Sequence, residues 1–190
     1  MKPNEKVIAR SNLFELVGLP QPDGRIFEVA RRAPGVRVII ADETSKRVLL
    51  TKEFRRELND FDWRLPGGKV FDSLAEYEEF RKSGKDIMPF AAAKAKAEAA
   101  EEAGMEVDDL LFVKRSTLGA TVEWDLYIFE TLTSRKHAKG QQLEAGEVVE
   151  SAEWRDAKHV EEMILEGKMQ EERVALALQQ WLYKKGWLSR

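Results

Sequence analysis

Three glutamates lie close together in the segment AKAEAAEEAGM, residues 95–105. At about 100° per residue, Glu98, Glu101 and Glu102 would fall within roughly 100° of one another on a helix. Such neighbours repel one another unless a positive charge lies between them. Carboxylate oxygens are ligands that Mg²⁺ takes in proteins, often together with substrate phosphates. The spacing alone fits two interpretations: a solvated acidic helix face and a site for a divalent cation.

Two helices are predicted around these glutamates. The longer one should begin near Pro89, because proline suits a first helical turn, and run through Ala103. Gly104 then follows as its C-terminal stop. A shorter helix is predicted over residues 73–82, where Ser73 begins a capping box.

Segments rich in β-branched residues predict strands on both sides of these helices. They are RIFEVARR, GVRVIIAD, RVLLTKEF and DWR before the helices, and LLFVKRSTL, EWDLYIFETL and EVVESAEWR after them. A turn at Pro34-Gly35 is expected between the first two. Helices over 157–166 and 171–184 should end the chain. The last has an apolar stripe expected in the core: Val174, Leu178, Trp181 and Leu182.

Composition excludes several classes of protein. The 190 residues are 43% hydrophobic and 34% charged with a net charge of −3, which gives no indication of a nucleic-acid or membrane surface. No cysteine is present for disulfides or thiolate metal sites, and His137 and His159 are expected to face solvent. No signal peptide or apolar run long enough for a membrane span is recognised, so a cytoplasmic location is expected.

The segments LPGG and EAAEEAGM, with DWRLPG leading into them, resemble the Nudix hydrolase signature G-x5-E-x7-R-E-U-x-E-E-x-G-U, where U is aliphatic. The resemblance implies that Glu98, Glu101 and Glu102 hold Mg²⁺, with Mn²⁺ as an alternative, and that Glu102 takes part in catalysis. The matching positions are Gly68, Glu98, Ala99, Glu101, Glu102, Gly104 and Met105.

The sequence departs from that signature in three ways. Gly68 and Glu98 are 30 residues apart instead of 15, so about 15 residues are inserted, with the predicted short helix as the natural insert. Pro89 stands where the first glutamate of the signature is expected. Ala97 replaces the arginine that orients the glutamates in the family, and Lys94, one turn before Glu98, is a candidate substitute.

The resemblance implies hydrolysis of a pyrophosphate linkage in a nucleoside diphosphate joined to another group. In the branch similar to ADP-ribose pyrophosphatases, a general base or further metal ligand comes from a loop after the signature. Here the loop GQQLEAGEVVE offers Glu147, the preferred candidate, and Glu144. Glu123 in LGATVEW is a further candidate.

The same branch implies substrate-binding residues and a partner. Arg55 in VLLTKEFR, or its neighbour Arg56, suits a phosphate or ribose contact, while a surface ion pair is the alternative. Gly68 would lie at the substrate, and Phe27 would help to hold a base across a homodimer interface, although a core position is the simpler interpretation of Phe27. Leu118 stands where such enzymes often have a proline, so GDP-mannose or another dinucleotide stays open beside ADP-ribose.

The expected architecture is an α/β (α+β) fold: a Nudix-like α/β/α sandwich with a mixed sheet, an N-terminal antiparallel strand extension and C-terminal helices. One domain over 1–190 is expected, with the extension at 1–34, the catalytic core at 35–155 including an insert near 73–88, and helices at 156–190. The rival hypotheses are a degenerate domain that binds nucleotide as a sensor, and a hydrolase of modified nucleoside triphosphates.

Overall fold

The structure is a computed structural model that describes residues 5–143 and 145–189. The strands are β1 Lys6–Arg10, β2 Phe14–Pro20, β3 Ile26–Arg32, β4 Gly35–Asp42, β5 Arg47–Arg55, β6 Asp60–Arg64, β7 Met105–Val107, β8 Leu111–Gly119, β9 Val122–Thr131, β10 Ser134–Lys136 and β11 Val149–Asp156. The helices are α1 Leu74–Lys82, α2 Met88–Ala103, α3 Ala157–Leu165 and α4 Glu172–Lys184. Among the described residues, no helix is both long and apolar enough to cross a membrane.

A large mixed sheet forms the centre of the molecule. Its strands follow the order β1-β2-β3-β9-β4-β5-β11, with β6 paired to β5 and β8 paired to β9. Strand β9 runs parallel to both β3 and β4, and the other pairs of this sheet are antiparallel. The short strands β7 and β10 form a separate antiparallel pair beyond α2.

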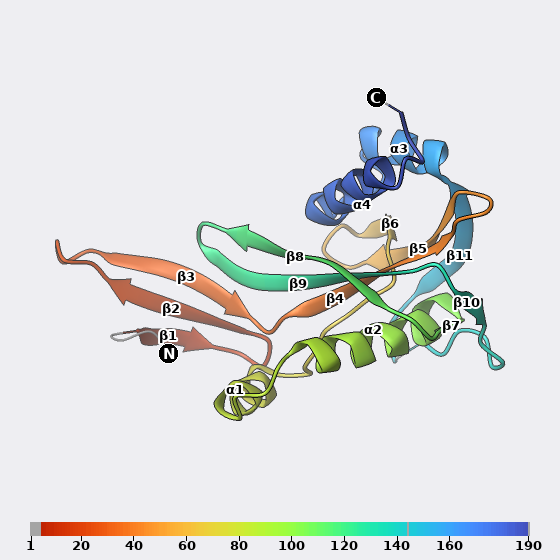
Figure 1. The fold of residues 1–190 in the computed structure, drawn as a ribbon. Coiled ribbons are helices and arrows are strands. Elements are labelled where there is room, and N and C mark those ends of the chain that lie inside the picture. The colour runs from red at the N-terminus through yellow and green to blue at the C-terminus, as the bar shows by residue number, and fades with distance from the viewer. Residues whose placement is uncertain (1–4, 144, 190) are drawn as a thin grey trace.

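Helices cover the sheet on two faces (Figure 1). Helix α2 lies against one face, and α3 and α4 lie against the other. Strand β4 is apolar almost throughout because it is buried on both sides: Val36 and Val38 pack toward α2, whereas Ile39 packs toward α3 and α4. This arrangement confirms the predicted α/β/α sandwich with a mixed sheet.

The predicted helices agree closely with the structure. In α1, the Ser73 hydroxyl accepts a hydrogen bond from the Glu76 N–H at 3.1 Å, as expected of an N-cap. Pro89 lies in the first turn of α2, and Gly104 ends that helix with a φ of 62°. The predicted apolar stripe of α4 is buried in the core, with Leu178 0% exposed.

The inserted helix α1 packs onto the start of α2 through aromatic rings. Phe71 lies 5.3 Å from Tyr77 and 4.9 Å from Phe80, measured between ring centroids. Phe80 in turn lies 4.8 Å from Phe90 of α2. The insert is therefore anchored at the N-terminal end of the helix that carries the three glutamates.

The predicted turn at Pro34-Gly35 is wrong. Strands β3 and β4 both pair in parallel with β9, so the chain continues in one direction past Pro34. Glycine is needed at position 35 for close packing, since a Cβ there would lie 3.0 Å from the Gly68 carbonyl oxygen. A Pro-Gly pair indicates a break in the strand, and here the break does not reverse the chain.

The N-terminal strands extend the sheet away from α2, α3 and α4, and α1 lies beside the connection between β1 and β2 (Figure 1). Strands β1, β2 and β3 form an antiparallel set, which confirms the predicted extension. Strand β1 is exposed throughout. The short strands β7 and β10 were not predicted, because three residues are too few for an alternating pattern to be recognised.

Candidate active site

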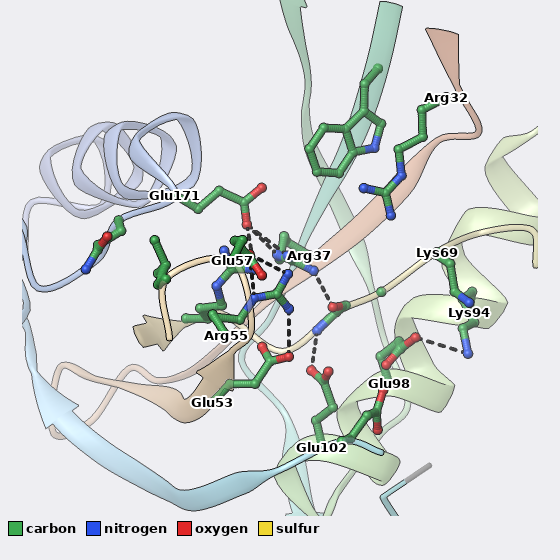
Figure 2. Close-up of a pocket in the computed structure, with 17 residues that line it drawn as sticks. Arg32, Arg37, Glu53, Arg55, Glu57, Lys69, Lys94, Glu98, Glu102 and Glu171 are labelled. Atoms are coloured by element: carbon green, nitrogen blue, oxygen red, sulfur yellow. Dashed lines mark hydrogen bonds and ion pairs between the residues drawn. The ribbon is translucent and has the colours of Figure 1, made fainter. Parts of the chain in front are cut away.

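A cavity of about 510 Å³ lies where α2 meets the Gly67-Gly68 turn, strands β5 and β6, and the start of α4. Figure 2 shows carboxylates from α2 on one side of it and a group of arginines with their own carboxylates on the other. The lining residues are Arg32, Arg37, Glu53, Arg55, Glu57, Leu58, Arg64, Gly67, Gly68, Lys69, Lys94, Glu98, Glu102, Trp124, Glu147, Gln170 and Glu171.

The Gly67-Gly68 turn packs directly against the carboxylates of α2. A Cβ on Gly68 would lie 2.1 Å from Oε1 of Glu98. A Cβ on Gly67 would lie 2.2 Å from the Val36 carbonyl oxygen, and Gly67 has a φ of 151°. A side chain at Gly67 would collide with the backbone of β4, and one at Gly68 would displace the Glu98 carboxylate, so the glycines allow the turn to approach both β4 and α2. The fold thereby brings Gly68 to Glu98 despite the inserted residues.

Glu102 is held in the cavity with little compensation for its charge. It is 5% exposed, and its Oε2 accepts a hydrogen bond from the Gly67 N–H at 2.7 Å. Burial, followed by the negative charge of Glu98, raises the pKa of Glu102 to about 8. Burial also raises the pKa of Glu98, which is 6% exposed. Two carboxylates are therefore buried side by side at a site that favours added positive charge.

Lys94 supplies part of that charge. Its Nζ lies 3.0 Å from Oε1 of Glu98 and 3.6 Å from Oε2 of Glu101. The sequence predicted this contact from the one-turn spacing of Lys94 and Glu98. Glu101 is the most exposed of the three glutamates and does not line the cavity.

The donor chemistry of this cluster fits a hard divalent cation, since carboxylate oxygens suit Mg²⁺ or Mn²⁺. The raised pKa of Glu102 shows that its buried carboxyl disfavours a free negative charge, which either a proton or a cation would relieve. Within residues 5–143 and 145–189, however, no three His, Cys, Asp or Glu side chains are placed to hold a metal ion together. Lys94 lies between Glu98 and Glu101, while Glu102 turns toward the Gly67 N–H.

The other side of the cavity is an arginine network centred on Glu171. Oε2 of Glu171 lies 2.8 Å from Nη2 of Arg37 and 3.4 Å from Nη1 of Arg64. Arg37 also donates to the Gly67 carbonyl oxygen. Burial raises the pKa of Glu171, but the charges of Arg37 and Arg64 outweigh it and lower that pKa to about 2. This network fixes the glycine turn from the side opposite Glu102.

The predicted substrate-binding residues do not all lie at the cavity. Arg55 lines the cavity, but its guanidinium lies 2.9 Å from carboxylate oxygens of both Glu53 and Glu57. Arg56 is exposed and does not line the cavity. Phe27 is 45% exposed on β3, also outside the lining, so the core interpretation of Phe27 is wrong. The part of β3 that contains Phe27 pairs with β2 but not with β9, which reaches β3 at Ala30 and Arg31.

The candidates for the general base also lie in different places. Glu147 lines the cavity, and its negative charge contributes to the raised pKa of Glu98. Glu144 lies outside the described residues. Glu123 accepts a hydrogen bond from Nε of Arg31 at 2.6 Å and lines a different cavity. The structure thus places Glu147, among the described candidates, beside the α2 carboxylates.

The arginine side of the cavity was missed at the level of sequence. Arg37 gave a signal, because it is the one charged residue inside the apolar stretch GVRVIIA. A charge in a doubly buried strand needs a partner. Its partner Glu171 gave none, since a glutamate before a helix is common. Trp124 and Arg32 also line the cavity without a motif that marks them.

No protein-family model matches the chain, and no curated protein matches it in sequence. Solved structures do match. One is a crystal structure titled as an ADP compounds hydrolase, which superposes with a TM-score of 0.68 at 19% sequence identity. The match covers 98% of this chain and 95% of that one. At this identity the likeness establishes the fold, and it confirms the Nudix-like sandwich predicted from the sequence.

Proposed function

We propose that the protein is a Mg²⁺-dependent pyrophosphohydrolase of nucleoside diphosphates linked to a sugar, with ADP-ribose converted to AMP and ribose 5-phosphate as the favoured reaction. The observation that carries this proposal is the buried pair Glu98 and Glu102 against the Gly67-Gly68 turn, in a cavity whose other side is rich in arginine. A site with these two sides can bind cations and phosphates together.

The chain's own residues would divide the chemistry. Glu98, Glu101 and Glu102 would hold the metal, and Glu147 would accept a proton from the attacking water. A bound Mg²⁺ would offset phosphate charge and lower the pKa of water. Oxygen from water forms a new bond to one phosphorus, the bridging oxygen leaves with the other phosphate, and two phosphomonoesters result. The buried walls of the cavity exclude water, and this strengthens the electrostatic interactions between the substrate and the protein.

The structural neighbour supports the reaction class. That protein is titled an ADP compounds hydrolase, and nearly the whole of both chains superposes. The sequence motif and the fold therefore agree on the same class by separate routes. Substrate choice among ADP-ribose, GDP-mannose and other dinucleotides is left to experiment.

One observation favours a second candidate, a catalytically weak domain that binds nucleotide as a sensor. The ammonium of Lys94 lies among the carboxylates, 3.0 Å from Glu98, where a metal would also draw its ligands. Ala97 removes the arginine of the family signature. A protein in which Lys94 replaces the metal would bind nucleotide without cleaving it.

We also propose a homodimer formed through the N-terminal strands. Apolar side chains are exposed on this extension, and a second copy could cover them. Light scattering at micromolar concentration should give twice the monomer mass of 21.8 kDa. A monomer mass would contradict the proposal. The exposed side chains are Val7, Ile8, Phe14, Ile26 and Phe27.

The proposed activity is tested by measuring product release from ADP-ribose, GDP-mannose and NADH with Mg²⁺, each repeated with excess EDTA. Release of AMP from ADP-ribose that EDTA abolishes is the expected result. Turnover of another substrate would retain the mechanism and change the substrate. Nucleotide binding without turnover of any of the three would contradict the hydrolase and favour the sensor.

A further inference from the structure

Arg32, the last residue of β3, presents an uncommitted guanidinium to the cavity. Its guanidinium carbon lies 4.4 Å from the ring centroid of Trp124 and 5.3 Å from that of Phe14. The guanidinium of Arg32 forms no hydrogen bond or ion pair with any group in residues 5–143 and 145–189, and Figure 2 shows it apart from the contacts drawn between the other arginines and glutamates. The two rings fix its position while its five N–H donors stay available.

The other arginines of the cavity differ from Arg32 in this respect. Arg37 and Arg64 share Glu171, and Arg55 is held between two carboxylates. Their charges are therefore largely balanced inside the protein. Of the arginines that line the cavity, Arg32 is the one whose charge has no carboxylate in contact among the described residues.

The surroundings of Arg32 favour an anion. Burial, followed by the positive charge of Arg37, lowers the pKa of the Arg32 guanidinium, so its cationic form lacks compensation. Arg173 stacks on the same Trp124 ring, with its guanidinium carbon 3.9 Å from the centroid. Nε1 of Trp124 and Nη2 of Arg173 are buried and have no hydrogen-bond partner among the described residues. Buried N–H groups without an acceptor are costly, and of these two residues Trp124 lines the cavity, where a bound anion could supply an acceptor to its indole N–H.

We propose that Arg32, positioned by Trp124, binds a phosphate group of the substrate at the end of the cavity away from Glu98 and Glu102. A planar guanidinium can grip two phosphate oxygens at once, which an ammonium cannot. This assignment replaces Arg55, whose donors already face Glu53 and Glu57. It rests on the proposed function for the identity of the substrate, while the anion site itself rests on the contacts of Arg32.

The test is calorimetric titration of inorganic pyrophosphate in EDTA, so that no metal contributes. Wild type should bind, and Arg32→Gln should bind about tenfold more weakly or worse. Arg32→Lys keeps the charge without the paired donors and should fall between them. Arg81→Gln is the matched control, because Arg81 and Arg32 both line a second cavity of about 240 Å³ and Arg81 also stacks on an aromatic ring. Arg81→Gln should stay within twofold of wild type.

Three outcomes would overturn the inference: no pyrophosphate binding by wild type, equal binding by Arg32→Gln, or equal weakening by Arg81→Gln. Circular dichroism of each variant establishes that it is folded. Different outcomes would contradict the proposed function and the anion site. Pyrophosphate binding through Arg32 with no hydrolysis of any substrate would remove the hydrolase and keep the anion site. Hydrolysis with an unchanged KM in Arg32→Gln would keep the hydrolase and remove the anion site.

Discussion

Two largely buried glutamates, Glu102 and Glu171, line the same cavity, and their pKa values are shifted in opposite directions. Glu171 faces Arg37 and Arg64, and its pKa falls to about 2. Glu102 lies beside Glu98 with one backbone N–H as its hydrogen-bond donor, and its pKa rises to about 8. The residue type and the cavity are the same, so the difference comes from the neighbouring charges.

This contrast separates a structural carboxylate from one that is suited to a ligand. The charge of Glu171 is balanced within the protein, where it joins β4, β6 and the start of α4. Lys94 and the Gly67 N–H do not offset the burial of Glu98 and Glu102, and the pKa of both carboxyls is raised. A buried charge without balance persists where function uses it. Under the proposed function, Glu98 and Glu102 would form a cation side of the cavity and the arginines a phosphate side.

The largest effect is expected from Glu102→Gln, which removes the charge and keeps the shape. Hydrolysis with saturating Mg²⁺ should fall by roughly 10²-fold or more, because under the proposed function the Glu102 carboxylate would hold the metal at the reaction centre. The melting temperature at pH 7 should not fall, since a pKa of about 8 already leaves the Glu102 carboxyl mostly neutral. Steady-state rates and thermal unfolding measure the two effects. A rate equal to wild type would show that the metal site is wrongly assigned.

Glu171→Gln should act on stability instead. Leaving Arg37 and Arg64 without their carboxylate should lower the free energy of unfolding by roughly 3 kcal/mol at pH 7. Because the folded pKa of about 2 lies below the ordinary 4.5, the native state binds fewer protons, and the wild-type advantage should shrink as pH falls from 4.5 toward 2. Urea unfolding at several pH values measures this.

The exposed neighbour Glu172 provides the control for that experiment. Glu172→Gln should change the free energy of unfolding by about 0.5 kcal/mol or less, as surface substitutions usually do. An equal loss in both variants, or a loss in Glu171→Gln that does not depend on pH, would contradict the arginine network as its cause.

A smaller effect is expected from Gly68→Ala. The new Cβ would overlap Oε1 of Glu98, which must move within a buried site. We expect about a tenfold loss in kcat/KM with little change in far-UV circular dichroism, since misplacement near the chemistry is costly. Gly84→Ala is the control for activity, because a Cβ there meets nothing within 4 Å. Its φ of 67° is strained for alanine, so this variant should lose some thermal stability and keep its rate. If both variants keep the wild-type rate, the contact between Gly68 and Glu98 does not matter for function.

The sequence predicted the elements of this fold well because their signals are local. Ser73, Pro89 and Gly104 mark helix ends by chemistry that acts within one turn. The failure at Pro34-Gly35 has the opposite origin, since the direction of β4 is decided by its pairing with β9, whose partner residues lie 91 positions further along the chain. Pairing between distant strands leaves no local trace.

The residues of the cavity also divide into those that the sequence predicted and those that it did not. The α2 carboxylates and Lys94 are close in sequence and form a recognisable pattern, so they could be anticipated. The contact of Arg37 with Glu171 spans 134 positions and links residues without a motif. The environment of Arg55 was also inaccessible from sequence, because its partners decide whether its donors are free. Charge balance is a property of the assembled cavity.

The most direct test of the contrast is Mn²⁺ binding by electron paramagnetic resonance to wild type, Glu102→Gln and Glu171→Gln, each verified as folded. Both substitutions remove one largely buried carboxylate from the same cavity. We predict that Glu171→Gln binds Mn²⁺ within twofold of wild type and that Glu102→Gln binds about tenfold more weakly or worse. Equal affinity of wild type and Glu102→Gln, or no binding by wild type, would contradict the assignment of the cation side.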